Sequence, residues 1–551
     1  MPKNPPREHS AGPVPAVDRR SFLGTLAAGA AAAAAIGPIA GQAVSDVEAA
    51  AIGPDSVQQR RQVSRRIRQD AAQLAFQRSL PEHPSNGEEQ DYPFVANFCK
   101  GLPHDGLGEV EPEAYAALLG ALETGAPGAF EQLPMAGPRK LVNPQASLGF
   151  DLEGPDSHHL AMRPAPRLDS PENSSEMAEL YWMALVRDVR FTDYDGDPLI
   201  QDAADDLSGM SDFRGPKQAG QVTPATLFRG LTPGDLTGPY VSQFLLRDFL
   251  YGSLLISHRQ QTVMPAIDYL TVYERWLNKQ SGAVGGPDEF DPTPRYIRNG
   301  RDLGQYVHVD ALYEAYLNAC LILLGMGAPV DPGNPYEGSD TQIGFGTFGG
   351  PHILSLVTEV ATRALKAVWF QKWLVHRRLR PEEFGGRVHN HVTGAAQYPI
   401  DAEILDSPVL DAVFSRYGTY LLPQAFPEGC PLHPAYGSGH ATVGGACVTI
   451  LKAWFDESFV VPDPVVPDAD GTSLVPYTGP GALTVGGELN KVAANIASGR
   501  NFAGIHWRTD FSEAIKLGEA VAIGILQEQK ATYNEPSSLS LTKFDGTTIT
   551  I

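Results

Sequence analysis

The sequence has few cysteines, no excess of positive charge and few long apolar runs. Its four cysteines are widely spaced and form no Cys-x-x-Cys pair. This excludes a zinc ribbon, an iron–sulfur site and a disulfide-based scaffold, although one or two isolated disulfides remain open. Sixty-four acidic residues against 42 basic ones give a net charge of −22. Because such a charge repels nucleic-acid phosphates and anionic lipid surfaces, we expect neither as a partner.

Strand-like alternation is also scarce, whereas apolar residues recur at the spacings of three and four that are typical of helices. The 551 residues are 42% hydrophobic, which is enough for a large core. Helices are predicted over residues 111–124, 175–189, 241–256, 306–324, 353–379, 440–455, 488–498 and 511–531. The clearest strand pattern lies at the C-terminus, where Asp545-Gly546 predicts the tight turn of a hairpin. We therefore expect a mainly α fold, with one large helical domain and minor β-hairpins.

Residues 1–43 have the composition of an export signal. An arginine pair, Arg19-Arg20, precedes an Ala/Gly-rich stretch from residue 24 to residue 41, and small residues follow it. The segment resembles a twin-arginine signal. The alternative is a membrane anchor, but the stretch is only weakly apolar and a proline interrupts it. We expect cleavage after residue 43, which leaves residues 44–551 as a single exported domain, periplasmic or secreted, without a membrane segment.

Three short clusters concentrate the residues that can do chemistry. In the first, Lys372, His376 and Arg380 are spaced four apart. This spacing predicts that they share one helix face, and Pro381 predicts the end of that helix. The alternative is a solvated basic face without a ligand.

The second cluster is a glycine-rich loop that leads directly into a predicted helix. It runs from His433 through Gly437-Ser438-Gly439 to His440. Free backbone N–H groups, a serine hydroxyl and the positive end of the helix dipole would bind an anion there. Alone, the turn is equally consistent with Ser438 as a simple helix N-cap. The two flanking histidines favour a chemical role, because histidine moves protons near neutral pH.

The third cluster pairs Arg500 with His506 across a predicted helix end at Gly504. On its own such a pair is equally consistent with a surface ion pair and a packed histidine. The three clusters together supply three cations, a helix N-terminus and several histidines. This combination predicts a site for a small tetrahedral oxyanion.

The order Lys-x7-Arg-Pro, Ser-Gly-His and Arg-x5-His resembles the vanadium-dependent haloperoxidases and, more distantly, the acid phosphatases of the type 2 phosphatidic acid phosphatase superfamily. Further stretches are similar to the algal and cyanobacterial bromoperoxidase branch: residues 92–104, 298–303, 348–352, 354–380, 433–453 and 499–510. The similarity spans about residues 60–535. It implies the large helical-bundle fold of the vanadium haloperoxidases.

The resemblance implies a vanadate cofactor, with His506 as the only protein ligand of the metal. His440 would be the acid–base residue, and Lys372 would polarise the bound peroxide. The residues that would hydrogen-bond the vanadate oxygens are Lys372, Arg380, Ser438, Gly439 through its backbone N–H, and Arg500. Hydrogen peroxide would oxidise bromide or iodide to hypohalous acid, which halogenates small organic acceptors, while the vanadium remains in oxidation state V.

Trp369 and His433 match positions that border the halide site in this family. A histidine at position 433 is typical of the bromoperoxidase branch, whereas the fungal chloroperoxidases have an aromatic residue there. Bromide is therefore the expected halide. Relatives form dimers or larger shells, so the resemblance also implies a homo-oligomer.

Two further interpretations concern acidic residues. The loop over residues 336–342 lies where red-algal relatives hold a structural calcium, which makes Asp340 and Gln342 candidate calcium ligands, although the sequence keeps only part of the oxygen-ligand pattern. Asp310 is a candidate to orient His440 through a hydrogen bond, and the alternative is a solvated carboxylate on a helix.

Two other functions remain open from the residues. An acid phosphatase would use His506 as the nucleophile and His440 as the leaving-group acid, because phosphate and vanadate share charge and shape. The longer Lys-to-Arg spacing and His433 favour the peroxidase. A non-catalytic exported oxyanion-binding protein would need the cations and the helix terminus but has no use for both histidines.

Overall fold

A computed structural model describes residues 56–551. The chain divides into an N-terminal unit that ends at Arg68 and a second unit from Gln69 to Ile551. Helix α2 (Val57–Gln77) begins in the first unit and ends in the second. The expected export signal and its boundary at residue 43 lie outside the described residues. Among the helices that are described, none is long and apolar enough to cross a membrane.

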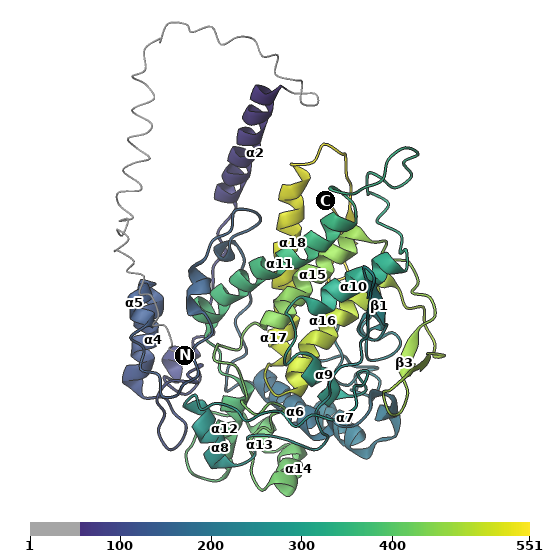
Figure 1. Cartoon of the computed structure of the whole chain (residues 1–551). Coiled ribbons are helices and arrows are strands. Elements are labelled where there is room, and N and C mark those ends of the chain that lie inside the picture. Colours follow the sequence, from purple (N-terminus) through teal and green to yellow (C-terminus); the bar gives the residue numbers. More distant parts are fainter. Residues whose placement is uncertain (1–55) are drawn as a thin grey trace, which may run out of the picture. The chain divides into compact units, whose positions relative to one another are not determined.

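The second unit is built around helix α15 (Gly439–Trp454), which is buried along almost its whole length. It packs against α11 (Gly350–Phe370), α16 (Val485–Phe502) and α18 (Ala514–Lys530), as Figure 1 shows. The contact between α15 and α18 brings backbone against backbone. A Cβ atom added to Gly445 would lie 2.0 Å from the Ile515 carbonyl oxygen, and one added to Gly518 would lie 1.9 Å from that of Thr442. Only glycine fits at these two positions.

Shorter helices surround this bundle. They are α3 (Glu88–Asp91), α4 (Pro112–Thr124), α5 (Pro127–Phe130), α6 (Pro171–Val186), α7 (Pro198–Gly209), α8 (Tyr273–Gln280), α9 (Gly300–Tyr306), α10 (Glu314–Gly325), α12 (Pro381–Val392), α13 (Ala402–Leu405), α14 (Pro408–Tyr417) and α17 (Arg508–Ser512). In the described part of the chain, six short strands form three antiparallel hairpins: β1 (Phe249–Tyr251) with β2 (Leu254–Ile256), β3 (Val465–Pro467) with β4 (Leu474–Pro476), and β5 (Ser540–Thr542) with β6 (Thr548–Thr550). The mainly α prediction and the C-terminal hairpin are confirmed, and the four cysteines, Cys99, Cys320, Cys430 and Cys447, are free and buried.

The helix predicted over residues 241–256 is wrong. A single 3₁₀ turn, Gln243–Leu245, is followed by the β1–β2 hairpin, whose turn contains Gly252 at a φ of 61°. Three of the apolar side chains that suggested a helix, Leu250, Leu254 and Leu255, are exposed on this hairpin. Their spacing therefore does not report a buried helix face.

The helix predicted over residues 306–324 is interrupted. Helix α9 ends at Tyr306 and α10 begins at Glu314, so residues 307–313 form an irregular connection. Asp310 lies in this connection, whereas we had expected it to lie on a helix.

The first cluster also differs from the prediction. After α11, the chain forms a π-helical turn, Gln371–His376, and Arg377 then adopts the left-handed conformation with a φ of 41°. Arg380 is the N-cap of the next helix, α12, and Pro381 is its first residue. Lys372, His376 and Arg380 therefore do not share a face of one helix. Pro381 begins a helix, which is the position where its missing N–H costs least.

Candidate active site

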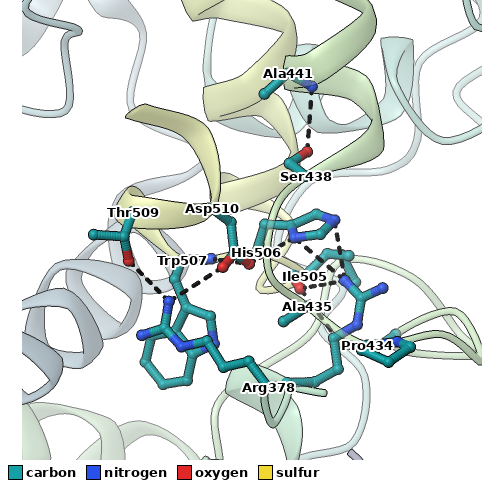
Figure 2. Close-up of polar contacts among 12 residues, drawn as sticks. Arg378, Pro434, Ala435, Ser438, Ala441, Ile505, His506, Trp507, Thr509 and Asp510 are labelled. Atoms are coloured by element: carbon teal, nitrogen blue, oxygen red, sulfur yellow. Dashed lines mark hydrogen bonds and ion pairs between the residues drawn. The ribbon is translucent and has the colours of Figure 1, made fainter. Parts of the chain in front are cut away.

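The N-terminus of α15 forms one side of the candidate site. The Ser438 hydroxyl caps the helix by accepting a hydrogen bond from the Ala441 N–H at 3.3 Å (Figure 2). A Cβ added to Gly439 would lie 3.2 Å from the Trp369 ring, so glycine allows α11 and the helix start to approach closely. The capping interpretation of Ser438 is confirmed, and the first turn of the helix also carries His440.

Three buried cations face this region without a neutralising carboxylate. Lys372 Nζ donates to the carbonyl oxygens of Pro434 and Ala435 at 2.7 and 2.8 Å, and Arg500 donates to the Val307 carbonyl oxygen at 2.8 Å. Within residues 56–551, neither of them nor Arg380 forms an ion pair. Two arginines adjacent in sequence form ion pairs instead: Arg377 pairs with Glu89, and Arg378 pairs with Glu176 and Asp510.

Burial and mutual repulsion make the three positive charges costly. Burial, with Arg380 and Arg500 nearby, lowers the pKa of Lys372 well below its usual value. Burial also lowers the pKa of Arg500 to about 10, and Arg380 adds to this effect. The Nε atom of Arg500 is buried and has no hydrogen-bond partner among the described residues. A bound anion would relieve the repulsion and supply the missing partner.

His506 lies against this group of cations as a neutral imidazole. Its Nδ1 is 2.7 Å from Asp510 Oδ2, and its Nε2 is 3.0 Å from a guanidinium nitrogen of Arg380. An ionised carboxylate only accepts and a guanidinium only donates, so the proton is on Nδ1 and Nε2 keeps its lone pair. Burial, together with Arg380, Lys372 and Arg500, holds the pKa of His506 well below its usual range. Nε2 thus carries the lone pair that an electrophile needs, and it would exchange the Arg380 hydrogen bond for that bond.

The residues that hold His506 were not predicted from the sequence. Asp510 Oδ1 accepts a hydrogen bond from Arg378 at 3.1 Å, and Arg378 also pairs with Glu176 at 2.9 Å. The Asp510 carbonyl oxygen accepts from the Ser438 N–H at 2.8 Å, so one residue links His506 to the α15 N-terminus. The i, i+4 spacing of His506 and Asp510 was the available signal.

His440 is paired with Asp310, as the sequence suggested. His440 Nε2 lies 3.1 Å from Asp310 Oδ1. Burial alone would raise the pKa of Asp310, but His440 holds it below its usual value. Burial lowers the pKa of His440, and Asp310 opposes this effect. The pair therefore consists of an ionised carboxylate and a histidine whose protonated form that carboxylate favours.

The two expected halide-site residues lie together. The rings of Trp369 and His433 are 4.9 Å apart between centroids, and His433 Nδ1 is 2.9 Å from a guanidinium nitrogen of Arg380. Burial and the neighbouring Arg380 and Lys372 hold the pKa of His433 well below its usual range. Both rings therefore border the group of cations.

Other sequence candidates lie apart from this group or have no metal-binding geometry. His376 packs edge-on against Tyr436, and burial lowers its pKa to about 3. Asp340 and Gln342 are exposed in the connection between α10 and α11, and the calcium interpretation stays a prediction. In the part of the chain that the structure describes, the group of three metal-ligating side chains with the required spacing is Asp156, His158 and His159.

The donor set fits a tetrahedral oxyanion such as vanadate. It combines three uncompensated cations, the free N–H groups of a helix N-terminus and an unpartnered guanidinium Nε. Beside them, a neutral imidazole nitrogen is available for a bond to a metal. Vanadate offers both the negative oxygens and the electrophilic centre that these groups require.

Comparisons with known proteins agree with this geometry. A family model described as the VCPO second helical-bundle domain matches residues 406–535. Vanadium-dependent bromoperoxidases from Corallina officinalis and Corallina pilulifera are each 41% identical over 597 residues, covering 91% of this chain and 100% of theirs. One from Ascophyllum nodosum is 37% identical over 84% of this chain and 87% of that protein.

A solved structure gives the same result for the fold. It is the homohexameric second vanadate-dependent bromoperoxidase (AnII) of Ascophyllum nodosum, with a TM-score of 0.88 and 31% identity over 95% of each chain. The chain belongs to the vanadium-dependent bromoperoxidase family.

Proposed function

We propose that this vanadate-dependent haloperoxidase oxidises bromide, and also iodide, with hydrogen peroxide to hypohalous acid, which halogenates small organic acceptors. The observation that carries the proposal is a buried group of three cations beside His506, none of which forms an ion pair within the described residues: Lys372, Arg380 and Arg500. The names of the relatives support bromide as the halide. The contact between Trp369 and His433 supports it further, because it places both rings beside the cations.

In the proposed mechanism, bound vanadate supplies a Lewis acid that activates hydrogen peroxide without changing its own oxidation state. The three cations neutralise the oxygens, and Ser438 and the Gly439 N–H orient them. His506 Nε2 is the metal ligand. Asp510 is a positioning residue, because it fixes the tautomer that leaves this nitrogen unprotonated.

His440 would move the protons of the reaction. Asp310 occupies its Nε2, so Nδ1 is the nitrogen that can take a proton from hydrogen peroxide and return it. The Asp310 charge stabilises the imidazolium that forms. Lys372 donates to two carbonyl oxygens and keeps one N–H for a bound oxygen atom, which it would polarise.

Activity is expected to require vanadate and to be inhibited competitively by phosphate. Both anions use the same donors, Lys372, Arg380 and Arg500. Bromination measured with and without added orthovanadate, at increasing phosphate concentrations, tests this. Full activity in a vanadate-free, phosphate-rich preparation would contradict it. An assay of phosphate-ester hydrolysis by the same vanadate-free protein distinguishes the haloperoxidase from the acid phosphatase alternative, which predicts hydrolysis.

Export is proposed from the sequence alone. Replacing Arg19-Arg20 by Lys-Lys should leave the precursor in the cytoplasm, because the arginine pair is an address read by a receptor. Fractionation of cells that express either precursor measures this. An exchange of two other basic residues, Lys3 and Arg7, serves as the control. Unchanged export of the Lys-Lys precursor would mean that the segment has another role.

We also propose that the mature enzyme is a homo-oligomer. The homohexameric structure of the Ascophyllum nodosum relative supports this assembly in general terms.

A further inference from the structure

His308 lies between two carboxylates in the connection between α9 and α10. Its Nε2 is 2.7 Å from Glu428 Oε1, and its Nδ1 is 3.3 Å from Asp288 Oδ2. The ring also stacks on Phe426, with 3.8 Å between centroids and 5° between planes. The side chain is only 11% exposed. A hydrogen bond to Glu428 and the stack on Phe426 thus hold one imidazole ring, and Asp288 lies near Nδ1 without a hydrogen bond to it.

The residues beside His308 contact two residues of the candidate active site. The Val307 carbonyl oxygen accepts a hydrogen bond from Arg500 at 2.8 Å. On the other side, Asp310 pairs with His440 at 3.1 Å. The ring on which His308 stacks is itself near the site, because the Arg500 guanidinium carbon lies 5.4 Å from the Phe426 centroid.

This connection has little regular structure to hold it. Residues 307–313 are outside any helix or strand, and Val309 is 74% exposed. The His308 N–H bonds back to the Gln305 carbonyl oxygen at 3.1 Å, which fixes only the start of the connection. An irregular segment of this kind keeps a defined position through its side-chain contacts. Val307 is itself buried in the core, and His308 provides the side-chain contacts that follow it toward Asp310.

We propose that His308 is a positioning residue of the halide-oxidation reaction. Held by Glu428, Asp288 and Phe426, it sets the Val307 carbonyl for Arg500 and the Asp310 carboxylate for His440. The inference rests on the proposed roles of Arg500 and His440. It assigns to one residue the joint placement of an anion-binding group and a proton-transfer group.

The charges around His308 support this role. Burial alone would raise the pKa of Glu428, but His308 holds it below its usual value, so this carboxylate is ionised at neutral pH. Burial raises the pKa of Asp288, which makes it the weaker partner. Arg139 donates to the Glu428 carbonyl oxygen at 3.0 Å and fixes the segment that carries it. The principal anchor is therefore the pair of His308 and Glu428.

The test replaces His308 with glutamine in the full-length, vanadate-loaded enzyme. We expect the turnover number for bromide oxidation to fall about tenfold, as is typical when a supporting residue is lost. Asp310 raises the pKa of His440, so a displaced Asp310 should move the limb of the pH profile governed by His440 to lower pH. Vanadate affinity should also weaken several-fold, because Arg500 loses its fixed partner.

Two further measurements make the outcome independent of turnover. Vanadate binding and the NMR titration of His440 in vanadate-free protein report the positions of Arg500 and Asp310 even if the proposed reaction is wrong. His352→Gln is the matched control. His352 is also packed among aromatic rings but lies in the first turn of α11, about 30 Å along the helix axis from Lys372.

The results separate positioning from a purely structural role. If His308→Gln lowers the melting temperature as His352→Gln does but keeps the wild-type pH profile and vanadate affinity, the proposal is wrong. If His308→Gln does not fold, Glu428→Gln provides the test. This variant removes the charge but keeps an acceptor for His308, so its shifts should have the same direction and a smaller size. Wild-type values in Glu428→Gln would also overturn the proposal.

Discussion

His506→Ala is expected to reduce vanadate affinity by more than about 10²-fold and to abolish bromide oxidation. Loss of a residue that only supports a metal ligand costs 10- to 100-fold, and loss of the ligand itself should cost more. The three cations remain in this variant, so an anion is still attracted, but by hydrogen bonds alone. Equilibrium dialysis with vanadium analysis measures the affinity, and a bromination assay measures the turnover.

His440→Ala should give a different result. The metal ligand and the cations stay in place, so vanadate should bind with moderately reduced affinity. Bromide oxidation should fall by about 10²-fold or more, because proton transfer is lost. If His440→Ala abolished binding while His506→Ala retained it, the two roles would be reversed. Activity in both variants would place the site elsewhere.

Asp510→Asn is expected to weaken vanadate binding by about 10- to 100-fold without removing any group that contacts the anion. An asparagine amide can turn its NH₂ group toward Nδ1 of His506, which moves the imidazole proton to Nε2. The nitrogen that should bind the metal is then protonated. Arg378 keeps its ion pair with Glu176 at 2.9 Å, which limits the loss of stability.

Vanadate affinity and the ¹⁵N NMR signals of His506 test this effect. Asp411→Asn on the exposed surface of α14 is the control for the loss of one negative charge. The control should keep the wild-type affinity and tautomer. If Asp510→Asn also kept both, Asp510 would have no part in positioning His506.

The sequence predicts the parts of the fold that depend on local pattern. Helix α15 begins and ends within one residue of its predicted bounds, because a serine N-cap and a continuous apolar sequence specify it. The helix predicted over residues 241–256 is wrong because apolar spacing there does not reflect burial: Leu254 and Leu255 are apolar but exposed. The π-helical turn after α11 has no local signal, and its shape depends on the packing of Lys372 against distant carbonyl groups.

The same distinction applies to the candidate site. Short motifs predict Lys372, Arg380 and the Ser438–His440 turn, because their residue types and spacing carry the chemistry. The supporting contacts join residues far apart in the chain: 130 positions separate Asp310 from His440, and 132 separate Arg378 from Asp510. The sequence suggested Asp310 as a partner of His440, but the folded chain was needed to establish that contact and to show that Asp510 and Arg378 hold His506.

The direct backbone contact between α15 and α18 determines how substitutions far from the pocket affect it. A side chain at residue 518 would collide with the Thr442 carbonyl group, and Thr442 lies one helical turn after Ser438, to which its N–H is bonded at 2.9 Å. A helix moves as a stiff rod, so a displacement at residue 442 also moves Ser438 and His440 relative to His506. The mutational tolerance of the pocket is thus partly set by α18, a helix that contributes no side chain to it.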